Sequence, residues 1–269
     1  MSGPRVARLD RALTVDIVPE FPSTQPADPS EPEQDTAGVG PVTAATDRMV
    51  RSVERLDQPA MGEPSLCTGW TRAHVVSHVA RNADALSNLL TWAGTGVETP
   101  MYVSAQARDA DIATGAGRDA GAILDDLRAS AQRFATAVAS LPDEAWERQV
   151  RMGPAASGAT IPARRVLWQR LKEVEIHHVD LAAGYTPADW APWFVDRALA
   201  ETLRMFGRRD DVPGLTLVVD GTPERLGPGG DATVSGPAVA VLGWLTGRSA
   251  GDGLTVDPPG PLPPLPAWA

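Results

Sequence analysis

Histidine is the residue type most able to do chemistry near neutral pH, and this chain has only four. His177 and His178 lie within VLWQRLKEVEIHHVDLAAG, and His74 and His78 lie within TRAHVVSHVARNADAL. An imidazole can bind a divalent metal ion or move a proton. Because all four histidines fall in two short segments, we expect these segments to meet at one site.

Two carboxylates accompany the later histidine pair. Glu173 precedes His177 by four residues and Asp180 follows it by three, so on a helix all three project from one face. A carboxylate and an imidazole one turn apart can hold a divalent cation, and the next carboxylate is then free to act beside it. With a histidine from the other segment, three nitrogen and oxygen ligands leave a fourth position open. That pattern is typical of catalytic zinc sites, although other divalent metals accept the same ligands.

The remaining candidates are less specific. His74 and His78 lie four residues apart on one helix face, so their spacing does not distinguish which of them is the ligand. His178 points about 100° away from His177 on a helix, which favours a packing or surface role. Cys67 is the only cysteine and has no basic residue at helical spacing, which favours a half-buried structural cysteine over a nucleophile.

Four amphipathic helices are expected to position these residues. Apolar residues recur at helical spacing over 42–56, from a cap at Thr68 or Thr71 to about residue 92, over 119–141 and over 166–184. Pro142 ends the third helix. Residues 94–118 and 147–160 are expected to be irregular. Helices of this length joined by loops favour a four-helix bundle, whose interior is a common place for a metal site.

The sequence changes character after Tyr185. Its pattern predicts helices over 190–206 and 237–246 and strands over 215–220, 232–235 and 254–257. We therefore expect a mainly α protein, with a four-helix bundle followed by a smaller α+β domain. The expected organisation is a disordered leader over 1–40, the bundle over 41–186, the α+β domain over 187–258 and a proline-rich, extended tail over 259–269.

The composition excludes several function classes. A formal net charge of -10 argues against nucleic acid as a partner, because phosphate binding needs a basic face. One cysteine permits no intrachain disulfide, and no apolar run approaches the roughly 20 residues that span a bilayer. The amino-terminal arginines are not followed by an apolar segment, which argues against a signal peptide. We expect a cytoplasmic protein that is a monomer or a small homo-oligomer.

Three long segments carry a resemblance to a known family. SLCTGWTRAHVVSHVARNADAL, PMYVSAQARDADIATGA and RLKEVEIHHVDLAAGYTPADW resemble the mycothiol-dependent maleylpyruvate isomerase family, over about residues 42 to 257. The resemblance implies a DinB-like four-helix bundle followed by a domain similar to sterol carrier proteins. One departure is visible, because relatives commonly have Leu-Pro where this chain has Cys67-Thr68. We expect that departure to alter the loop ahead of the second helix and to touch no proposed ligand.

The resemblance also assigns roles to individual residues. It implies that His78, Glu173 and His177 are the zinc ligands and that Asp180 is needed for activity. It further implies that Arg248, within WLTGRS, reaches the active site from the second domain.

The chemistry that this family implies is reversible addition of a thiol, mycothiol. A thiol at an open zinc position loses its proton and becomes a nucleophile. Its addition to the double bond of maleylpyruvate allows rotation, and its expulsion leaves fumarylpyruvate. Such a dicarboxylate needs a guanidinium clamp, for which Arg248 is the first candidate and Arg108 the second, unless they form surface salt bridges. Asp180 would orient a ligand or move a proton, and Asn82 would contact the cofactor or serve packing.

Three alternatives remain open at this stage. The chain could be a mycothiol S-transferase that releases the adduct of an electrophile. It could instead be a non-catalytic binder of thiol conjugates that uses the second domain. In the third alternative the metal is purely structural, and then a thiol should not change the spectrum of the cobalt-substituted protein.

Overall fold

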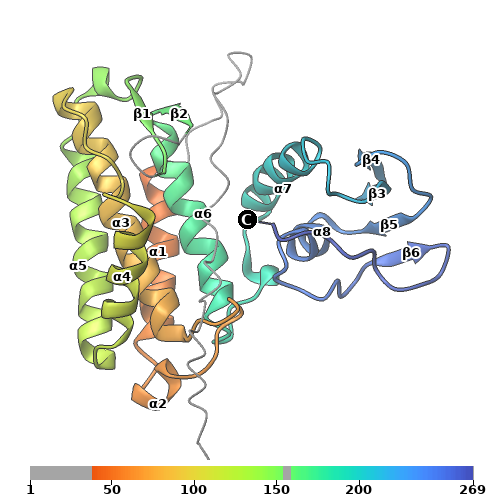
Figure 1. The fold of residues 1–269 in the computed structure, drawn as a ribbon, viewed down its shortest axis with the longest axis horizontal. Helices are drawn as coiled ribbons and strands as arrows, with labels where there is room; N and C mark the ends of the chain where they lie inside the picture. The colour runs from red at the N-terminus through yellow and green to blue at the C-terminus, as the bar shows by residue number, and fades with distance from the viewer. Residues whose placement is uncertain (1–37, 154–158, 269) are drawn as a thin grey trace, which may run out of the picture.

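Four helices form a bundle in the computed structural model, which describes residues 38–153 and 159–268. They are α1 (Val39–Val53), α3 (Arg72–Thr95), α5 (Ala120–Ala139) and α6 (Arg165–Asp180). Helix α1 contacts α5 and α6, and α3 contacts the same two helices, so the four close around a common core (Figure 1). Large apolar side chains such as Met49, Leu86 and Leu127 are fully buried there.

Local sequence explains where α3 and α5 begin and end. Helix α3 starts after Thr71, whose backbone N–H and side-chain hydroxyl both lie within hydrogen-bond distance of His74 Nδ1, at 3.4 and 2.8 Å. It stops at Gly96, which adopts the left-handed conformation that glycine tolerates best. Helix α5 starts after Asp119, whose carboxylate accepts from the backbone N–H of Ala122 at 2.9 Å.

Helix α6 is the element through which the two halves of the chain meet. Every one of its residues is buried, including its charged side chains. One side of the helix faces α1 and α3, and the other faces the carboxyl-terminal part of the chain (Figure 1). Charges taken out of water need partners, so the charged side chains of this helix are expected to form ion pairs.

Several short elements depart from the sequence expectation. Helix α2 (Gln58–Met61) lies in a predicted loop, and helix α4 (Ala105–Ala116) lies in the predicted irregular segment 94–118. Strands β1 (Gln149–Arg151) and β2 (Thr160–Pro162) pair antiparallel within and just beyond the predicted irregular segment 147–160. Helix α4 was missed because AQARDADIATGA has no continuous apolar stripe. It is nonetheless held against α3.

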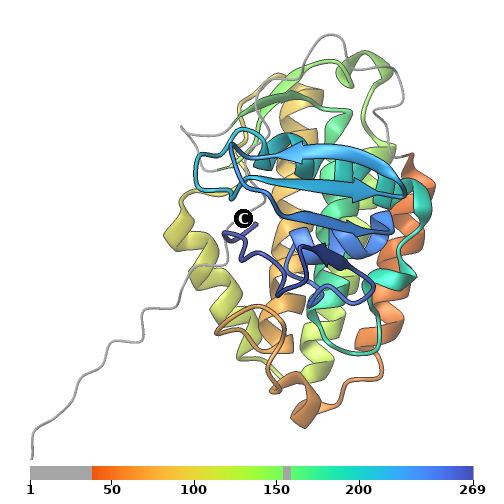
Figure 2. The same cartoon turned by 90° about the vertical axis from the view of Figure 1, so that its right-hand side faces the viewer.

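The carboxyl-terminal unit is a small sheet covered by two helices. Its elements are α7 (Pro192–Phe206), β3 (Leu215–Val219), β4 (Thr222–Leu226), β5 (Thr233–Gly236), α8 (Ala238–Leu245) and β6 (Thr255–Asp257). The sheet order is β4-β3-β5-β6, with β3 parallel to β5 and the other two pairs antiparallel. The sequence did not predict β4, whose residues are mostly exposed. Helices α7 and α8 lie between the sheet and the bundle, as Figures 1 and 2 show.

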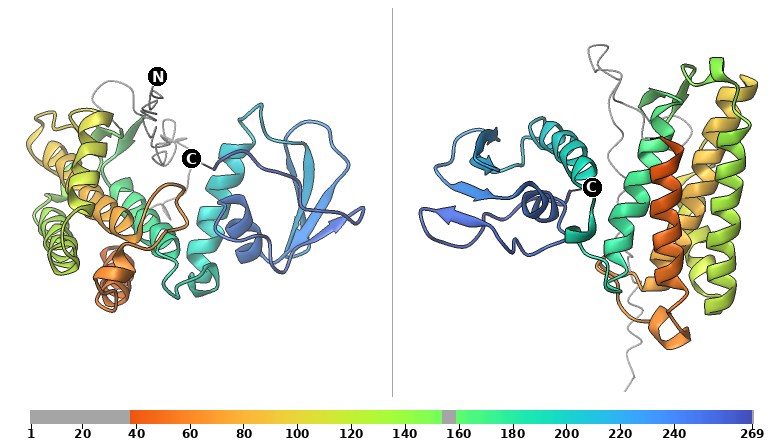
Figure 3. Two further views of the ribbon diagram at one scale, coloured as in Figure 1. Left: turned by 60° about the horizontal axis from the view of Figure 1, so that its bottom comes forward. Right: turned by 180° about the vertical axis from the view of Figure 1, so that it is seen from behind.

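The predicted leader falls outside the described residues up to residue 37, and α1 already begins at Val39, earlier than predicted. After β6 the proline-rich segment runs without helix or strand back toward the junction of the two units (Figure 3). No helix in the described ranges is long and apolar enough to cross a membrane. The expectation of a mainly α protein with a smaller α+β unit is confirmed.

Candidate functional site

The structure brings His78, Glu173 and His177 together in the bundle interior. His78 projects from α3, and the other two project from α6, one turn apart. Glu173 Oε2 lies 3.0 Å from His78 Nε2 and 3.4 Å from His177 Nε2. One ligand atom from each residue lies within 4.8 Å of the other two, and all three side chains are buried.

This donor set fits a divalent cation. Two imidazole nitrogens and one carboxylate oxygen converge on one point from two rigid helices, which is the ligand chemistry of a three-coordinate zinc site with an open position. The two imidazole rings meet edge to face, with centroids 4.6 Å apart, and the Nε2 atom of each ring lies near Glu173 Oε2.

The electrostatics of the three residues favour the ligating protonation states of His78 and Glu173. Burial lowers the pKa of His78 to about 4, and the adjacent His177 acts in the same direction. His78 is therefore neutral at neutral pH, as a metal ligand must be. Burial alone would raise the pKa of Glu173, but hydrogen bonds from His177 and His78 hold it well below its usual range.

Asp180 fixes the orientation of His177. Asp180 Oδ2 lies 2.8 Å from His177 Nδ1, so the opposite ring nitrogen, Nε2, is the one that faces Glu173. Burial opposes both charges, yet the contact with Asp180 raises the pKa of His177 above its usual value. A carboxylate behind a ligating imidazole holds the ring and increases its basicity toward a metal.

Arg248 brings the second unit to the same place. It follows α8, and its Nε and Nη2 donate to the two oxygens of Asp180 at 2.9 and 2.7 Å. Its Nη1 donates to the carbonyl of Thr246 at 2.6 Å. Burial opposes the charge on Asp180, but Arg248 and His177 keep the pKa of that carboxyl below its usual range. A bidentate pair of this kind is both strong and directional.

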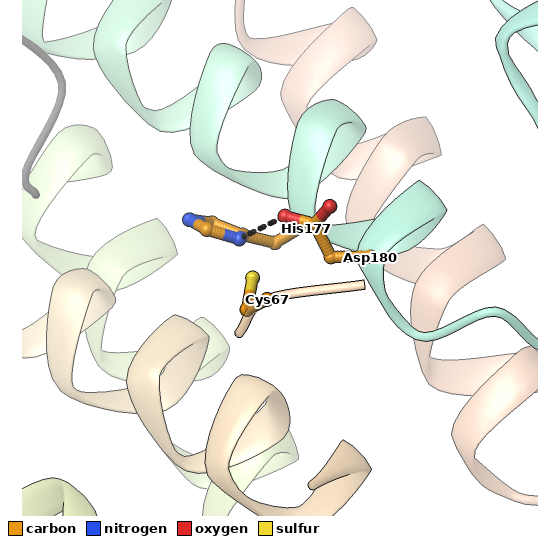
Figure 4. A group of neighbouring side chains, drawn as sticks. All are labelled: Cys67, His177 and Asp180. Atoms are coloured by element: carbon orange, nitrogen blue, oxygen red, sulfur yellow. Dashed lines mark hydrogen bonds and ion pairs between the residues drawn. The ribbon is translucent and has the colours of Figure 1, made fainter. Parts of the chain in front are cut away.

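Cys67 lies beside this pair, which the sequence did not indicate. Its sulfur, a ring nitrogen of His177 and a carboxylate oxygen of Asp180 lie within 4.8 Å of one another (Figure 4). The residue is buried rather than half-buried, and its contact with His177 helps to raise the pKa of that imidazole. The expectation that the Cys67-Thr68 departure touches no proposed ligand is therefore wrong.

The position of Cys67 has a cause in tertiary structure. The backbone N–H of Leu66 donates to the carbonyl of Asp180 at 2.9 Å, which ties the loop before α3 to the end of α6. Loop placement of this kind depends on a contact between segments more than a hundred residues apart, so helical spacing could not reveal it.

The other histidines have structural partners. His74 contacts the cap residue Thr71 at the start of α3, so it is His78 and not His74 that lies with Glu173 and His177. His178 is buried, with Nε2 2.8 Å from Ser52 Oγ, and it stacks on Tyr185 with ring centroids 3.8 Å apart. Its packing role agrees with its direction on the helix.

Arg108 and Asn82 occupy different positions relative to the centre. Arg108 on α4 is buried, and its Nη2 lies 3.4 Å from His78 Nδ1, so a guanidinium borders the ligand set. Asn82 Oδ1 instead accepts from Arg170 Nη1 at 3.0 Å. Arg170 also donates to the carbonyl of Val79 at 2.8 Å.

Arg170 is a buried cation of the site that the sequence pattern did not single out. Burial lowers the pKa of Arg170 to about 10. Arg170 lies one helical turn before Glu173, and this spacing is the signal in the sequence that could have placed it on the same face of α6. The amide of Asn82 serves to pair this buried cation.

Comparisons with known proteins agree with this architecture. The family model described as the mycothiol maleylpyruvate isomerase N-terminal domain matches residues 42–182, and the model of the C-terminal domain of the same family matches residues 189–267. No curated protein matches the chain significantly.

Two solved structures are similar to the chain over most of its length. A crystal structure of the mycothiol-dependent maleylpyruvate isomerase has 36% sequence identity and a TM-score of 0.79, covering 85% of this chain and 95% of that one. The structure of a histidine-to-alanine mutant of that isomerase has 35% identity with the same TM-score and the same coverage. The chain therefore belongs to the mycothiol-dependent maleylpyruvate isomerase family.

Proposed function

We propose that this protein is a zinc-dependent, mycothiol-using cis–trans isomerase that converts maleylpyruvate, or a similar unsaturated dicarboxylate, to its trans isomer. The observation that carries the proposal is the meeting of His78, Glu173 and His177 beside an Asp180–Arg248 pair supplied by two different units. Family membership supports the same reaction class.

Each protein group has a distinct task in this reaction. His78, Glu173 and His177 would hold the cation, which supplies an open position where a thiol loses its proton. The cofactor thiol supplies reversible addition to the double bond, which permits rotation about it. Asp180 keeps His177 oriented, because it binds the ring nitrogen opposite Glu173.

Two guanidinium groups are placed to bind the carboxylates of the substrate. Arg248 has five N–H donors, of which three bond to Asp180 and Thr246 in the described part of the chain, so two remain for a substrate oxygen. Arg108 borders the centre at His78, and its Nη1 also pairs with Asp109 at 3.0 Å. Because these positive charges come from α4 and from the second unit, they would hold the two ends of a short dicarboxylate around the reacting bond.

The test is a reaction assay combined with metal analysis of the purified, zinc-loaded protein. With mycothiol and maleylpyruvate we expect fumarylpyruvate to form, and with glutathione in place of mycothiol we expect far slower formation. Accumulation of a stable thiol adduct without the isomer would instead favour an S-transferase. If neither the isomer nor the adduct formed, the proposal would be contradicted.

Two variants separate metal binding from substrate binding. His78→Ala should lose bound zinc, because only two of the three ligands remain. Arg248→Ala should retain zinc and lower kcat/KM for the dicarboxylate by about a hundredfold, as expected for a lost charged contact of about 3 kcal/mol. Zinc content in His78→Ala equal to that of the parent protein would remove the metal assignment.

A further inference from the structure

The carboxyl-terminal segment, residues 258–268, is fastened onto the second unit. Leu262 and Leu265 pack against the hydrophobic core. Leu262 fits closely over Gly251, where an added Cβ would lie 2.1 Å from the leucine Cδ1. Arg209 Nη1 donates to the carbonyl of Ala267 at 2.7 Å. These contacts fix the path of the segment up to the residue before Trp268.

Trp268 ends this path over Arg248. The Arg248 Cζ atom lies 5.4 Å from the centroid of the Trp268 ring, within the range of a cation–π contact. Arg248 remains charged, since burial lowers its pKa but Asp180 outweighs that effect. Arg248 thus connects the indole to Asp180, the carboxylate that orients His177.

The geometry of Arg248 explains what the indole adds. Asp180 and Thr246 bind N–H groups at the edge of the planar guanidinium. Hydrogen bonds at an edge do not cover the two faces of the plane. An aromatic ring within cation–π distance of the guanidinium carbon limits the motion of the long side chain, in addition to the hydrogen bonds at its edge.

We propose that Trp268 is a positioning residue for the active site. Its indole holds the Arg248 guanidinium in the orientation that receives a substrate carboxylate, and the proline-rich segment serves to deliver that indole. The inference rests on the proposed role of Arg248 in binding an anionic substrate. It assigns a role in the reaction to the proline-rich segment 258–268, which the spacing of the sequence does not suggest.

The experiment measures substrate-like binding separately from turnover. Zinc-loaded Trp268→Ala, Trp268→Phe and Trp193→Ala proteins are compared with the parent for succinate binding by calorimetry and for kcat and KM with maleylpyruvate. Trp193 is a matched control, because it is an indole that is 45% exposed at the start of α7. Zinc content and the melting temperature are measured for each protein.

Loss of the ring should act on binding. In Trp268→Ala we expect succinate affinity to fall about fivefold, which corresponds to about 1 kcal/mol, and KM to rise by a similar factor while kcat changes less than twofold. Trp268→Phe should restore most of the affinity, because it keeps an aromatic face. Trp193→Ala should match the parent protein.

Distinct outcomes would overturn the two proposals. Unchanged succinate affinity and KM in Trp268→Ala would overturn the positioning role, even if Arg248→Ala shows that the arginine binds substrate. A Trp268→Leu protein that binds succinate as well as the parent would also overturn it, since packing alone would then suffice. Weakened succinate binding in Trp268→Ala without isomer formation by the parent would sustain the positioning role and contradict the isomerase.

Discussion

Asp180 connects the two parts of the candidate site. Its carboxylate contacts His177 on its own helix and Arg248 from the second unit, and it is 1% exposed. Its backbone carbonyl accepts from Leu66 in the loop that carries Cys67. One residue therefore sets the ring of a proposed ligand, the direction of a guanidinium and the path of a loop.

Replacing Asp180 by Asn should damage the site while keeping its shape. The neutral amide would leave the partly buried Arg248 without its counter-charge and would hold His177 less firmly. We expect kcat/KM to fall by about a hundredfold and zinc affinity to fall by about tenfold or more. The measurements are steady-state kinetics and competition with a zinc-binding dye.

The control for this substitution is a carboxylate away from the site. Asp125 has a side chain that is 80% exposed, so Asp125→Asn should leave kcat/KM and zinc affinity unchanged. If Asp180→Asn behaved like this control, the carboxylate would have no part in catalysis or in metal binding.

His178 should make the protein sensitive to acid. Burial lowers its pKa to about 4, with Arg48 acting in the same direction, whereas the unfolded value is 6.5. Between those values the unfolded chain binds more protons, so the free energy of unfolding falls as the pH falls from about 6.5 to about 4. The full shift corresponds to about 3 kcal/mol.

Removing this imidazole should flatten the pH dependence. Urea unfolding of the zinc-loaded parent and of His178→Asn is compared at several pH values between 7.5 and 4. We expect a smaller loss of stability in the variant across the acidic range, although its stability at pH 7.5 is lower because the contacts with Ser52 and Tyr185 change. Parallel curves would show that His178 does not carry this dependence.

At the scale of elements, α6 was predictable and α4 was not. Leu167, Leu171 and Val174 give α6 a regular apolar pattern, and the helix begins within one residue of the predicted start. It ends at Asp180, four residues before the predicted end, because the chain turns there before Gly184. Helix α4 is rich in Ala and has few large apolar residues, and its position against α3 comes from tertiary packing.

The same distinction applies to the site. Residues on regular helices, such as Glu173 and His177, could be paired from spacing alone, because helical geometry fixes their relative positions. Arg248 was reached only through the family resemblance. Cys67 and Trp268 lie in segments without regular structure, where long-range contacts set the position of each side chain and no local period exists to report it.

The junction between α6 and α7 should depend on Glu201. Its carboxylate on α7 accepts from Trp168 Nε1 at 2.7 Å, from Lys172 Nζ at 2.8 Å and from Arg165 Nη2 at 3.2 Å. Glu201→Ala would leave two buried cations of α6 without this partner, so we expect unfolding to become easier by about 3 kcal/mol or more. Urea unfolding measures the loss.

An exposed ion pair supplies the comparison for Glu201. Glu54 pairs with Arg128, and both side chains are about as exposed as typical surface residues, at 40% and 47%. Glu54→Ala should cost less than about 1 kcal/mol. Equal losses in the two variants would mean that the α6–α7 ion pairs contribute no more than a surface contact.

At the scale of the whole molecule, three guanidinium groups lie around the site although the chain has a net charge of -10. Arg108, Arg170 and Arg248 approach the ligand set from α4, α6 and the second unit. A local cluster of guanidinium groups in an otherwise acidic protein favours a small anion over a polyanion, because the net negative charge of the chain repels a long polyanion. This arrangement agrees with a dicarboxylate substrate.

Metal removal should lower the stability of the whole protein, since the proposed ligands join α3 to α6. A ligand that binds only the folded state stabilises it by about 2.7 kcal/mol at a free concentration one hundred times its dissociation constant. We therefore expect a chelator to lower the melting temperature by several degrees and zinc to restore it. Calorimetric scans with and without zinc measure this difference in melting temperature.

Two histidines that spacing could not separate give opposite results in this experiment. In His78→Ala, zinc should not raise the melting temperature, because the substitution removes a proposed ligand. In His74→Ala, zinc should raise the melting temperature as much as in the parent, because His74 contacts the cap of α3 and not the metal site. The melting temperature of this variant should be lower than that of the parent both with and without zinc. If zinc raised the melting temperature of His78→Ala but not that of His74→Ala, the metal ligands would differ from the residues that the structure brings together.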